Sequence, residues 1–217
     1  MVSQLLISLL LFITGYGSRL AFELNKDQAP ADVRYILETE QYRLYFKRAE
    51  MLVHVGTEDL RIQFAGNLNR RVPEGAGRLD NLVRYVQADD QDKTVHVPKF
   101  ASVRYESLYT GIDFTCYGRG GQLQCDFAVM AGGDPNDITI TINDAGRLDV
   151  DPAGSLIIES AGQTVRLPRP VAFQLDRGQR SPVDIGYRVS GHDITFVVGT
   201  YARGIPLIIA TGTRRAP

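Results

Sequence analysis

A glycine-rich reversal between two cysteines is the feature that most constrains this chain. Residues 97–127, VPKFASVRYESLYTGIDFTCYGRGGQLQCDF, are rich in the aromatic and β-branched side chains that strands favour. Glycine adopts positive φ at little steric cost, so Gly120 and Gly121 suit a two-residue hairpin loop. With that loop, Cys116 lies directly opposite Cys125. The stretch therefore predicts an antiparallel hairpin in a defined register.

The same register predicts a Cys116–Cys125 disulfide. Paired residues alternate outward from the loop between hydrogen-bonded and non-hydrogen-bonded positions, and the cysteines fall on the second kind, where side chains approach closely. Two small buried thiols are the alternative, because free cysteine is often a core residue. An export signal favours the disulfide, since such bonds persist in oxidising compartments.

A period of two recurs along most of the chain and indicates half-buried antiparallel strands. Apolar residues alternate with other residues at 42–46, 51–55, 60–64, 138–142 and 194–198. Turn sequences rich in Asp and Gly separate these segments at intervals of about ten residues. Leu79, Leu82, Val83 and Val86 suit a short helix, but residues 82–87 equally suit a strand, and we favour the strand. The sequence thus predicts an all-β fold, an antiparallel β-sandwich-like domain of many short strands with little or no helix.

Composition limits the partners of this domain. The 217 residues are 44% hydrophobic, enough to bury a proper core, and 24 basic residues nearly balance 25 acidic ones. A formal charge of −1 without a dense basic patch gives no electrostatic footprint for nucleic acid. The Gly-Arg-Gly-Gly run at 118–121 is not a phosphate cradle, because it joins two strands rather than a strand and a helix. We expect no nucleic acid partner.

The N-terminal residues predict export. Residues 5–13 are apolar except for Ser8, and Gly15-Tyr16-Gly17 offers small residues for a cut before Ser18. We therefore expect a secretory signal peptide at 1–17, a single β-sandwich-like domain at 18–210, a flexible tail at 211–217, and a secreted or cell-envelope location. The first four residues carry no Lys or Arg. A buried N-terminal strand and an uncleaved anchor remain alternatives.

The sequence contains no constellation typical of catalysis. It has no G-x-S-x-G, H-E-x-x-H or C-x-x-C motif, and its three histidines lie far apart. Asp113 and Asp126 flank the central hairpin, where carboxylates usually serve as hydrogen-bond acceptors. The acidic turns at 89–92 and 134–137 do not have the spacing of a calcium loop and are better explained as solvated turns. We expect no catalytic residue, no metal and no cofactor.

Several segments resemble the N-terminal domain of bacterial SBBP-repeat proteins, which are exported chains in which this domain precedes predicted β-propeller repeats. The similarity covers nearly all of residues 21–209, and its strongest part is Val103-Arg-Tyr-Glu-Ser-Leu-Tyr-Thr-Gly-Ile-Asp113. The other matching segments are Phe22-Glu-Leu-Asn-Lys-Asp-Gln28, Val33-Arg34-Tyr35, the rest of the stretch from Val97-Pro98 through Phe127 with Tyr117-Gly118 and Asp126-Phe127, Asp134-Pro135, and Pro206-Leu-Ile-Ile209. The resemblance implies a fold and a surface location but no reaction.

The chain departs from that family at three places. Cys116 and Cys125 stand where aromatic residues are common in the family, and their joint change supports a contact between them. Lys93 stands where tryptophan is expected. After Ile209 the sequence does not continue into propeller repeats, so it is either a fragment of a longer chain or a stand-alone version.

These observations predict a non-catalytic interaction or assembly module of a cell-envelope or surface protein. Its expected partner is another protein or adjoining propeller repeats, and after signal cleavage no membrane span remains. A carbohydrate-binding module is the first alternative, with Tyr105, Tyr109 and Tyr117 facing a surface glycan, although tyrosines in strands are more often packing partners. A hydrolase or a mutarotase-like enzyme is the second.

Overall fold

The predicted all-β architecture is confirmed. A computed structural model describes residues 20–66, 71–80, 83–87, 90–160 and 163–211. Within these residues the only helical element is the 3₁₀ turn η1 (Pro135–Asp137), and all other regular structure is strand. No helix in the described part of the chain has the length and apolar character needed to span a bilayer. The predicted signal peptide and residues 212–217 lie outside the described residues.

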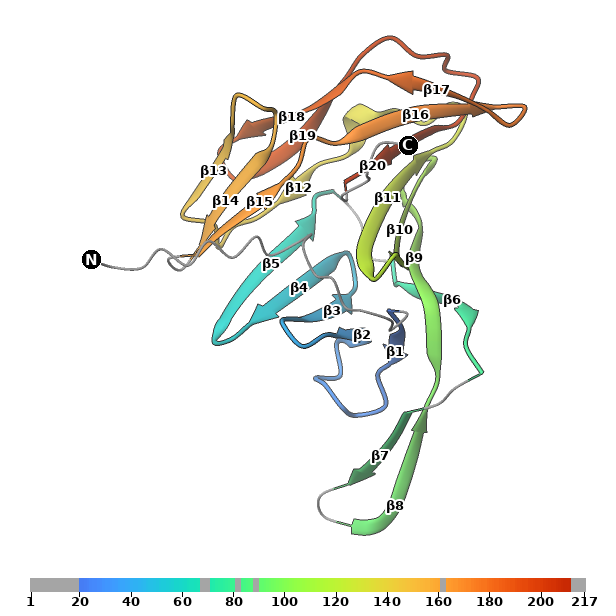
Figure 1. Cartoon of the computed structure of the whole chain (residues 1–217), viewed down its shortest axis with the longest axis vertical. Coiled ribbons are helices and arrows are strands. Elements are labelled where there is room, and N and C mark those ends of the chain that lie inside the picture. The colour runs from blue at the N-terminus through green and yellow to red at the C-terminus, as the bar shows by residue number, and fades with distance from the viewer. Residues whose placement is uncertain (1–19, 67–70, 81–82, 88–89, 161–162, 212–217) are drawn as a thin grey trace.

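One long antiparallel sheet contains most of the strands (Figure 1). Among the described residues it has 15 strands, of which 14 follow one another in a single hydrogen-bonded order. That order is β17 (Gln179–Val183), β16 (Val171–Asp176), β20 (Leu207–Ala210), β11 (Gln122–Val129), β10 (Ile112–Arg119), β9 (Lys99–Tyr109), β1 (Phe22–Leu24), β2 (Val33–Glu38), β3 (Arg43–Lys47), β4 (Glu50–Val55), β5 (Glu58–Phe64), β12 (Ile140–Thr141), β19 (Asp193–Val198) and β18 (Ile185–Ser190).

Three smaller pieces complete the fold. The strand β6 (Glu74–Arg78) pairs with β9 beside the main order. A three-stranded sheet contains β13 (Arg147–Val150), β14 (Leu156–Ser160) and β15 (Gln163–Leu167). The hairpin of β7 (Val83–Gln87) and β8 (Asp90–Val97) projects from the body of the molecule (Figure 1). The favoured strand within residues 82–87 is therefore confirmed for 83–87.

The long sheet curls back on itself to enclose a core. Its two terminal strands, β17 and β18, are successive in the chain and are separated only by Asp184. Phe64 of β5 packs against Phe114 of β10 and Phe127 of β11, with ring centroids 4.9 and 6.4 Å away. Phe127 in turn contacts Phe196 of β19 at 5.9 Å. Strands far apart in the sheet order therefore face each other, which gives the predicted sandwich-like arrangement.

The central hairpin has the predicted register. Residues Arg119, Gly118, Tyr117 and Cys116 pair with Gln122, Leu123, Gln124 and Cys125, respectively. Gly120 and Gly121 form the loop, and both have positive φ, at 59° and 77°. Cys116 and Cys125 are joined by a disulfide, with Cα atoms 4.2 Å apart. The disulfide lies on the inner face of the sheet, since Cys116 is fully buried.

Candidate functional site

Two of the three tyrosines proposed to face a ligand lie in the core instead. Tyr105 is fully buried, and Tyr109 is only 7% exposed. The Tyr105 hydroxyl lies 2.8 Å from the carbonyl oxygen of Lys47, and the Tyr109 hydroxyl donates to the carbonyl of Thr139 at 2.7 Å. Burial raises the pKa of Tyr109 to about 12 and the pKa of Tyr105 well above its ordinary value. Both rings are structural, and neither offers a surface for a sugar.

The remaining candidates on the central hairpin serve local hydrogen bonds. The half-buried Tyr117 donates from its hydroxyl to Asp126 at 2.7 Å. Asp113 accepts a hydrogen bond from the backbone N–H of Ser107 and forms an ion pair with Arg104, both at 2.6 Å. Asp113 pairs with Ala128 whereas Asp126 pairs with Thr115, so the two carboxylates lie on different rows of the hairpin. They lie diagonally across the same face of the hairpin, and each is already engaged in a local hydrogen bond.

The acidic turn at 134–137 also has a structural role. Asp134 caps η1 by accepting a hydrogen bond from the backbone of Asn136 at 3.0 Å, and that hydrogen bond lowers the pKa of Asp134. In the part of the chain that the structure describes, no three His, Cys, Asp or Glu side chains gather as metal ligands would. The side chains of the other acidic turn, at 89–92, lie outside the described residues.

A polar groove lies beside the first strands of the sheet. It has a volume of about 470 Å³, a size common for ligand sites. Its walls come from the segment before β2, the end of β3, the start of β4, β5 and the segment before β6. The lining residues are Ala31, Asp32, Val33, Arg34, Lys47, Arg48, Glu50, Arg61 and Val72. We call this surface the β2–β5 groove.

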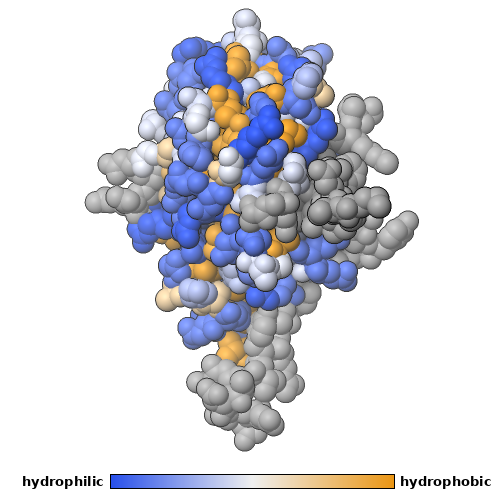
Figure 2. All heavy atoms as spheres, turned by 90° about the vertical axis from the view of Figure 1, so that its left-hand side faces the viewer, coloured by the Kyte–Doolittle hydropathy of each residue, from blue (hydrophilic) through white to orange (hydrophobic). Residues whose placement is uncertain are grey.

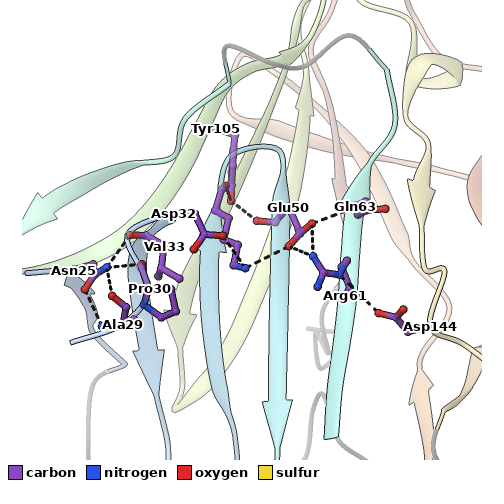
Figure 3. Close-up of polar contacts among 11 residues, drawn as sticks. Asn25, Ala29, Pro30, Asp32, Val33, Glu50, Arg61, Gln63, Tyr105 and Asp144 are labelled. Carbon is purple, nitrogen blue, oxygen red and sulfur yellow. Dashed lines mark hydrogen bonds and ion pairs between the residues drawn. The ribbon is translucent and has the colours of Figure 1, made fainter. Parts of the chain in front are cut away.

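Ion pairs run in a row along the β2–β5 groove (Figure 3). The carboxylate of Glu50 accepts from Arg61 at 3.0 and 3.2 Å and from Gln63 at 3.2 Å. Lys47 lies between Asp32, at 3.0 Å, and Glu50, at 3.7 Å. The Glu50 side chain is only 13% exposed, so these partners are what make its buried charge tolerable.

The turn beneath this row is fixed by backbone hydrogen bonds. Ala49 has a φ of 48°, a left-handed conformation that is uncommon outside glycine. Its N–H donates to the backbone carbonyl oxygen of Arg71 at 3.2 Å, and its carbonyl oxygen accepts from the backbone N–H of Phe64 at 3.1 Å. The Tyr105 hydroxyl reaches the same turn from the opposite layer, 3.1 Å from the carbonyl of Glu50 (Figure 3). The groove floor is therefore held in place before any partner arrives.

A side-chain amide fixes the opposite wall of the groove. The Asn25 amide nitrogen lies 3.0–3.1 Å from the carbonyl oxygens of Ala29, Pro30 and Val33, and its oxygen accepts from the Ala29 N–H (Figure 3). These contacts close the loop that leads into β2. The segment that carries Asp32 is thus held by Asn25 on one side and by Lys47 on the other.

The groove carries an excess of positive charge. Four of its lining side chains are basic and two are acidic, whereas the whole chain has a formal charge of −1. Arg34 is exposed and forms no ion pair with any described residue. The hydrogen bond from Lys47 lowers the pKa of Asp32, so that carboxylate stays charged. The arrangement suits binding of a polar, negatively charged segment, because complementary charge steers and orients a partner.

Sequence reasoning did not identify this groove. Its residues come from segments as far apart as Ala31 and Val72, and no local motif joins them. One signal was present: Glu50 follows a charged turn, yet it begins a strand whose neighbouring positions are apolar. A carboxylate at such a position needs basic partners, and the following strand supplies one in Arg61.

The match to a known family has the same bounds as the folded strands. A family model described as a domain of unknown function (DUF7948) matches residues 22–210. The chain belongs to this family. The DUF7948 match begins at the first residue of β1 and ends at the last residue of β20, so it includes the β2–β5 groove. No curated protein and no solved structure matches the chain.

Proposed function

We propose that this DUF7948 domain is a non-catalytic interaction module of an exported, cell-envelope or surface protein. The β2–β5 groove is its recognition site, and an acidic segment of a protein partner is the occupant. The observation that carries the proposal is the positively charged lining of a groove whose floor and walls are already fixed. A preformed site loses little conformational entropy when a partner binds.

The charges in the groove support a binding role over acid–base chemistry. The two lining carboxylates, Asp32 and Glu50, are each paired with a basic side chain, and the hydrogen bond from Lys47 lowers the pKa of Asp32. Arg34 remains available to an incoming carboxylate, because it is exposed and has no described ion-pair partner. Arginine suits this role, since its planar guanidinium binds carboxylates with two parallel hydrogen bonds.

Two exposed apolar residues on another face also support association with a protein. Register places Phe173 of β16 opposite Ile208 of β20, and Ile208 opposite Ala128 of β11, so these residues share a face. Phe173 itself is only 9% exposed, because the Arg180 guanidinium lies over its ring. On the same strands Val171 is 42% exposed and Leu175 is 54% exposed. Clustered exposed apolar residues are typical of protein contact surfaces. Adjoining propeller repeats, which the family resemblance implies, are one candidate for such a neighbour.

The positions of the three candidate tyrosines argue against the alternative of a carbohydrate-binding module. Tyr105 and Tyr109 are buried, so a row of stacking rings is not formed with Tyr117. The lining residues of the β2–β5 groove include no aromatic side chain. An acidic peptide segment fits this lining better than a neutral sugar does.

Site-specific photocrosslinking in the native host tests the proposal. A photoreactive phenylalanine analogue in place of Val72, which is 39% exposed at the groove, should give a protein adduct of defined mass in the cell-envelope fraction. Arg34→Glu in the same chain should abolish the adduct, because it reverses a charge in the site while leaving the core untouched.

The matched control uses Arg188, an exposed arginine of β18 that does not line the groove. Arg188→Glu should leave the adduct from position 72 unchanged. An adduct that survives Arg34→Glu, or that disappears equally with Arg188→Glu, would contradict recognition by the groove. Recovery of the chain from the cytoplasm alone would contradict its export.

A further inference from the structure

The β7–β8 hairpin extends from the body of the molecule as an arm. Among the described strands, β7 and β8 pair only with each other (Figure 1). The base of the arm is anchored, because Val97 is fully buried and the carbonyl oxygen of Pro98 accepts from the Leu24 N–H at 3.1 Å. A two-stranded hairpin on its own is only marginally stable in water. A partner that contacts the arm would therefore stabilise it.

The far end of the arm is acidic. Strand β7 ends at Gln87, which pairs with Asp90 at the start of β8, so the chain reverses between them. The sequence at 88–92 is Ala-Asp-Asp-Gln-Asp, with three carboxylates and no basic residue. Like charges at such short spacing repel one another, and a basic surface relieves that repulsion. We call residues 88–92 the acidic tip.

The β2–β5 groove offers the complementary charge. Its four basic and two acidic lining residues leave a net positive charge of two. Lys47 and Arg61 are already paired with the lining carboxylates. Arg34 is exposed and has no ion-pair partner among the described residues. It can therefore bind a carboxylate from another molecule without breaking an existing ion pair.

Charge, rather than apolar area, is the feature that suits the groove to such a contact. The groove lining includes no aromatic side chain. Hydrophilic residues predominate on the side of the molecule shown in Figure 2, and orange, apolar residues show between them. The whole chain has a formal charge of −1, so two copies repel each other only weakly. Opposite charges are nevertheless concentrated at the acidic tip and in the groove.

We infer that the β2–β5 groove binds the acidic tip of a second copy of this chain. The inference rests on the proposed function and names the protein partner. The tip and the groove are different surfaces, so the contact is heterologous and can repeat from copy to copy. Arg34 binds a carboxylate of the tip. The association should weaken as the salt concentration rises, because salt screens exposed charges.

Two complementary variants test the inference. Arg34→Glu reverses a charge in the groove and leaves the tip intact, whereas Asp90→Lys/Asp92→Lys reverses the tip and leaves the groove intact. Sedimentation velocity of the purified wild-type chain should show association that increases with protein concentration and decreases with salt. Each variant alone should associate at least about tenfold more weakly. An equimolar mixture of the two should recover association, because it combines an intact tip with an intact groove.

The matched controls carry the same charge changes elsewhere. They are Arg188→Glu and Glu106→Lys/Asp176→Lys, at exposed positions that neither line the groove nor belong to the arm. Both controls should associate as the wild-type chain does. If a charge reversal unfolds the chain, the neutral variants Arg34→Gln and Asp90→Asn/Asp92→Asn replace it and should also weaken association.

Crosslinking locates the contact. A photoreactive phenylalanine analogue at position 72 of the tip-reversed chain, mixed with the Arg34→Glu chain, should give an adduct with the combined mass of two chains. Peptide mapping should place the crosslink in residues 83–97 of the Arg34→Glu chain. A crosslink outside the arm would overturn the inference. So would a wild-type chain that stays monomeric up to about 1 mM, or a mixture that does not recover association.

A hexa-aspartate peptide separates failure of this inference from failure of the proposed function. The peptide should bind the wild-type chain, and Arg34→Glu should weaken its binding at least about tenfold. If the peptide binds in this way but two copies do not associate, recognition of acidic segments stands and the second copy is the wrong partner. If neither the peptide nor a second copy binds, both proposals fail.

Discussion

Tyr105 and Tyr187 are both buried on the inner faces of strands, yet their hydroxyl groups meet opposite surroundings. Tyr105 of β9 faces the first strands of the sheet, where two backbone carbonyls lie within 3.1 Å of its hydroxyl. Tyr187 of β18 lies on the other side of the fold, and no described residue offers its hydroxyl a partner. The Tyr105 hydroxyl is thus paired within the fold, whereas the Tyr187 hydroxyl is enclosed without a described partner.

This difference shows which buried hydroxyl groups stabilise the fold. In the first region the buried groups fix the turn beneath the β2–β5 groove, where we propose that a partner binds. In the second region the unpaired hydroxyl of Tyr187 is enclosed by the fold, so it adds a cost that no described contact offsets. Stability measurements should therefore separate the two regions, because a satisfied hydroxyl contributes to stability and an unsatisfied one does not.

Reduction of the disulfide should have the largest effect. Cys116 and Cys125 are nine residues apart, and closing a loop of this size stabilises a protein by about 2–3 kcal/mol in the chain-entropy model. Urea unfolding with and without reductant measures the difference, and alkylation counts the thiols. Two thiols that are alkylated in the native, unreduced protein would contradict the bond.

The strand pattern and this hairpin were predictable because they depend on local sequence. Alternation of apolar and polar side chains defines strands such as β3 and β4, and the pair of glycines at 120 and 121 sets the register of β10 and β11. The curling of the sheet was not predictable in this way. It depends on pairings such as Phe64 with Ile140, which join segments far apart in the chain.

The candidate sites were harder to predict for the same reason. In a fold of two layers, the alternation that places Tyr105 on one face of β9 does not say which face is enclosed. Tyr105 belongs to the aromatic cluster that includes Phe114, with ring centroids 6.1 Å apart. The β2–β5 groove also required tertiary structure, because Asp32, Lys47 and Arg61 come from three different strands or loops.

Removal of a single tyrosine hydroxyl should have the next largest effect on the free energy of unfolding, and it tests the difference between the two regions directly. Tyr105→Phe should lower the free energy of unfolding by about 1–2 kcal/mol, because it leaves buried carbonyl oxygens without their donor. Tyr187→Phe should change it by less than about 0.5 kcal/mol or stabilise the protein, because no described hydrogen bond is lost. Urea unfolding of the ligand-free proteins measures both.

Tyr109→Phe provides the parallel control for this pair. Its hydroxyl donates to the Thr139 carbonyl at 2.7 Å, so its loss should resemble that of Tyr105 rather than that of Tyr187. Equal destabilisation by Tyr105→Phe and Tyr187→Phe would remove the distinction between the two regions.

The smallest effect is expected at the rim of the groove, where Asp32 pairs with Lys47 at 3.0 Å. The Asp32 side chain is 64% exposed, so solvent screens the pair, and Asp32→Asn should cost no more than about 0.5 kcal/mol near pH 7. The hydrogen bond from Lys47 lowers the pKa of Asp32 in the folded protein below its ordinary value of 3.8. The stabilisation is therefore present above about pH 4 and is lost as the pH falls through the lowered pKa. Urea unfolding of both proteins between pH 7 and pH 3 should show their difference shrinking on acidification, and a difference that grows as the pH falls would contradict the ion pair.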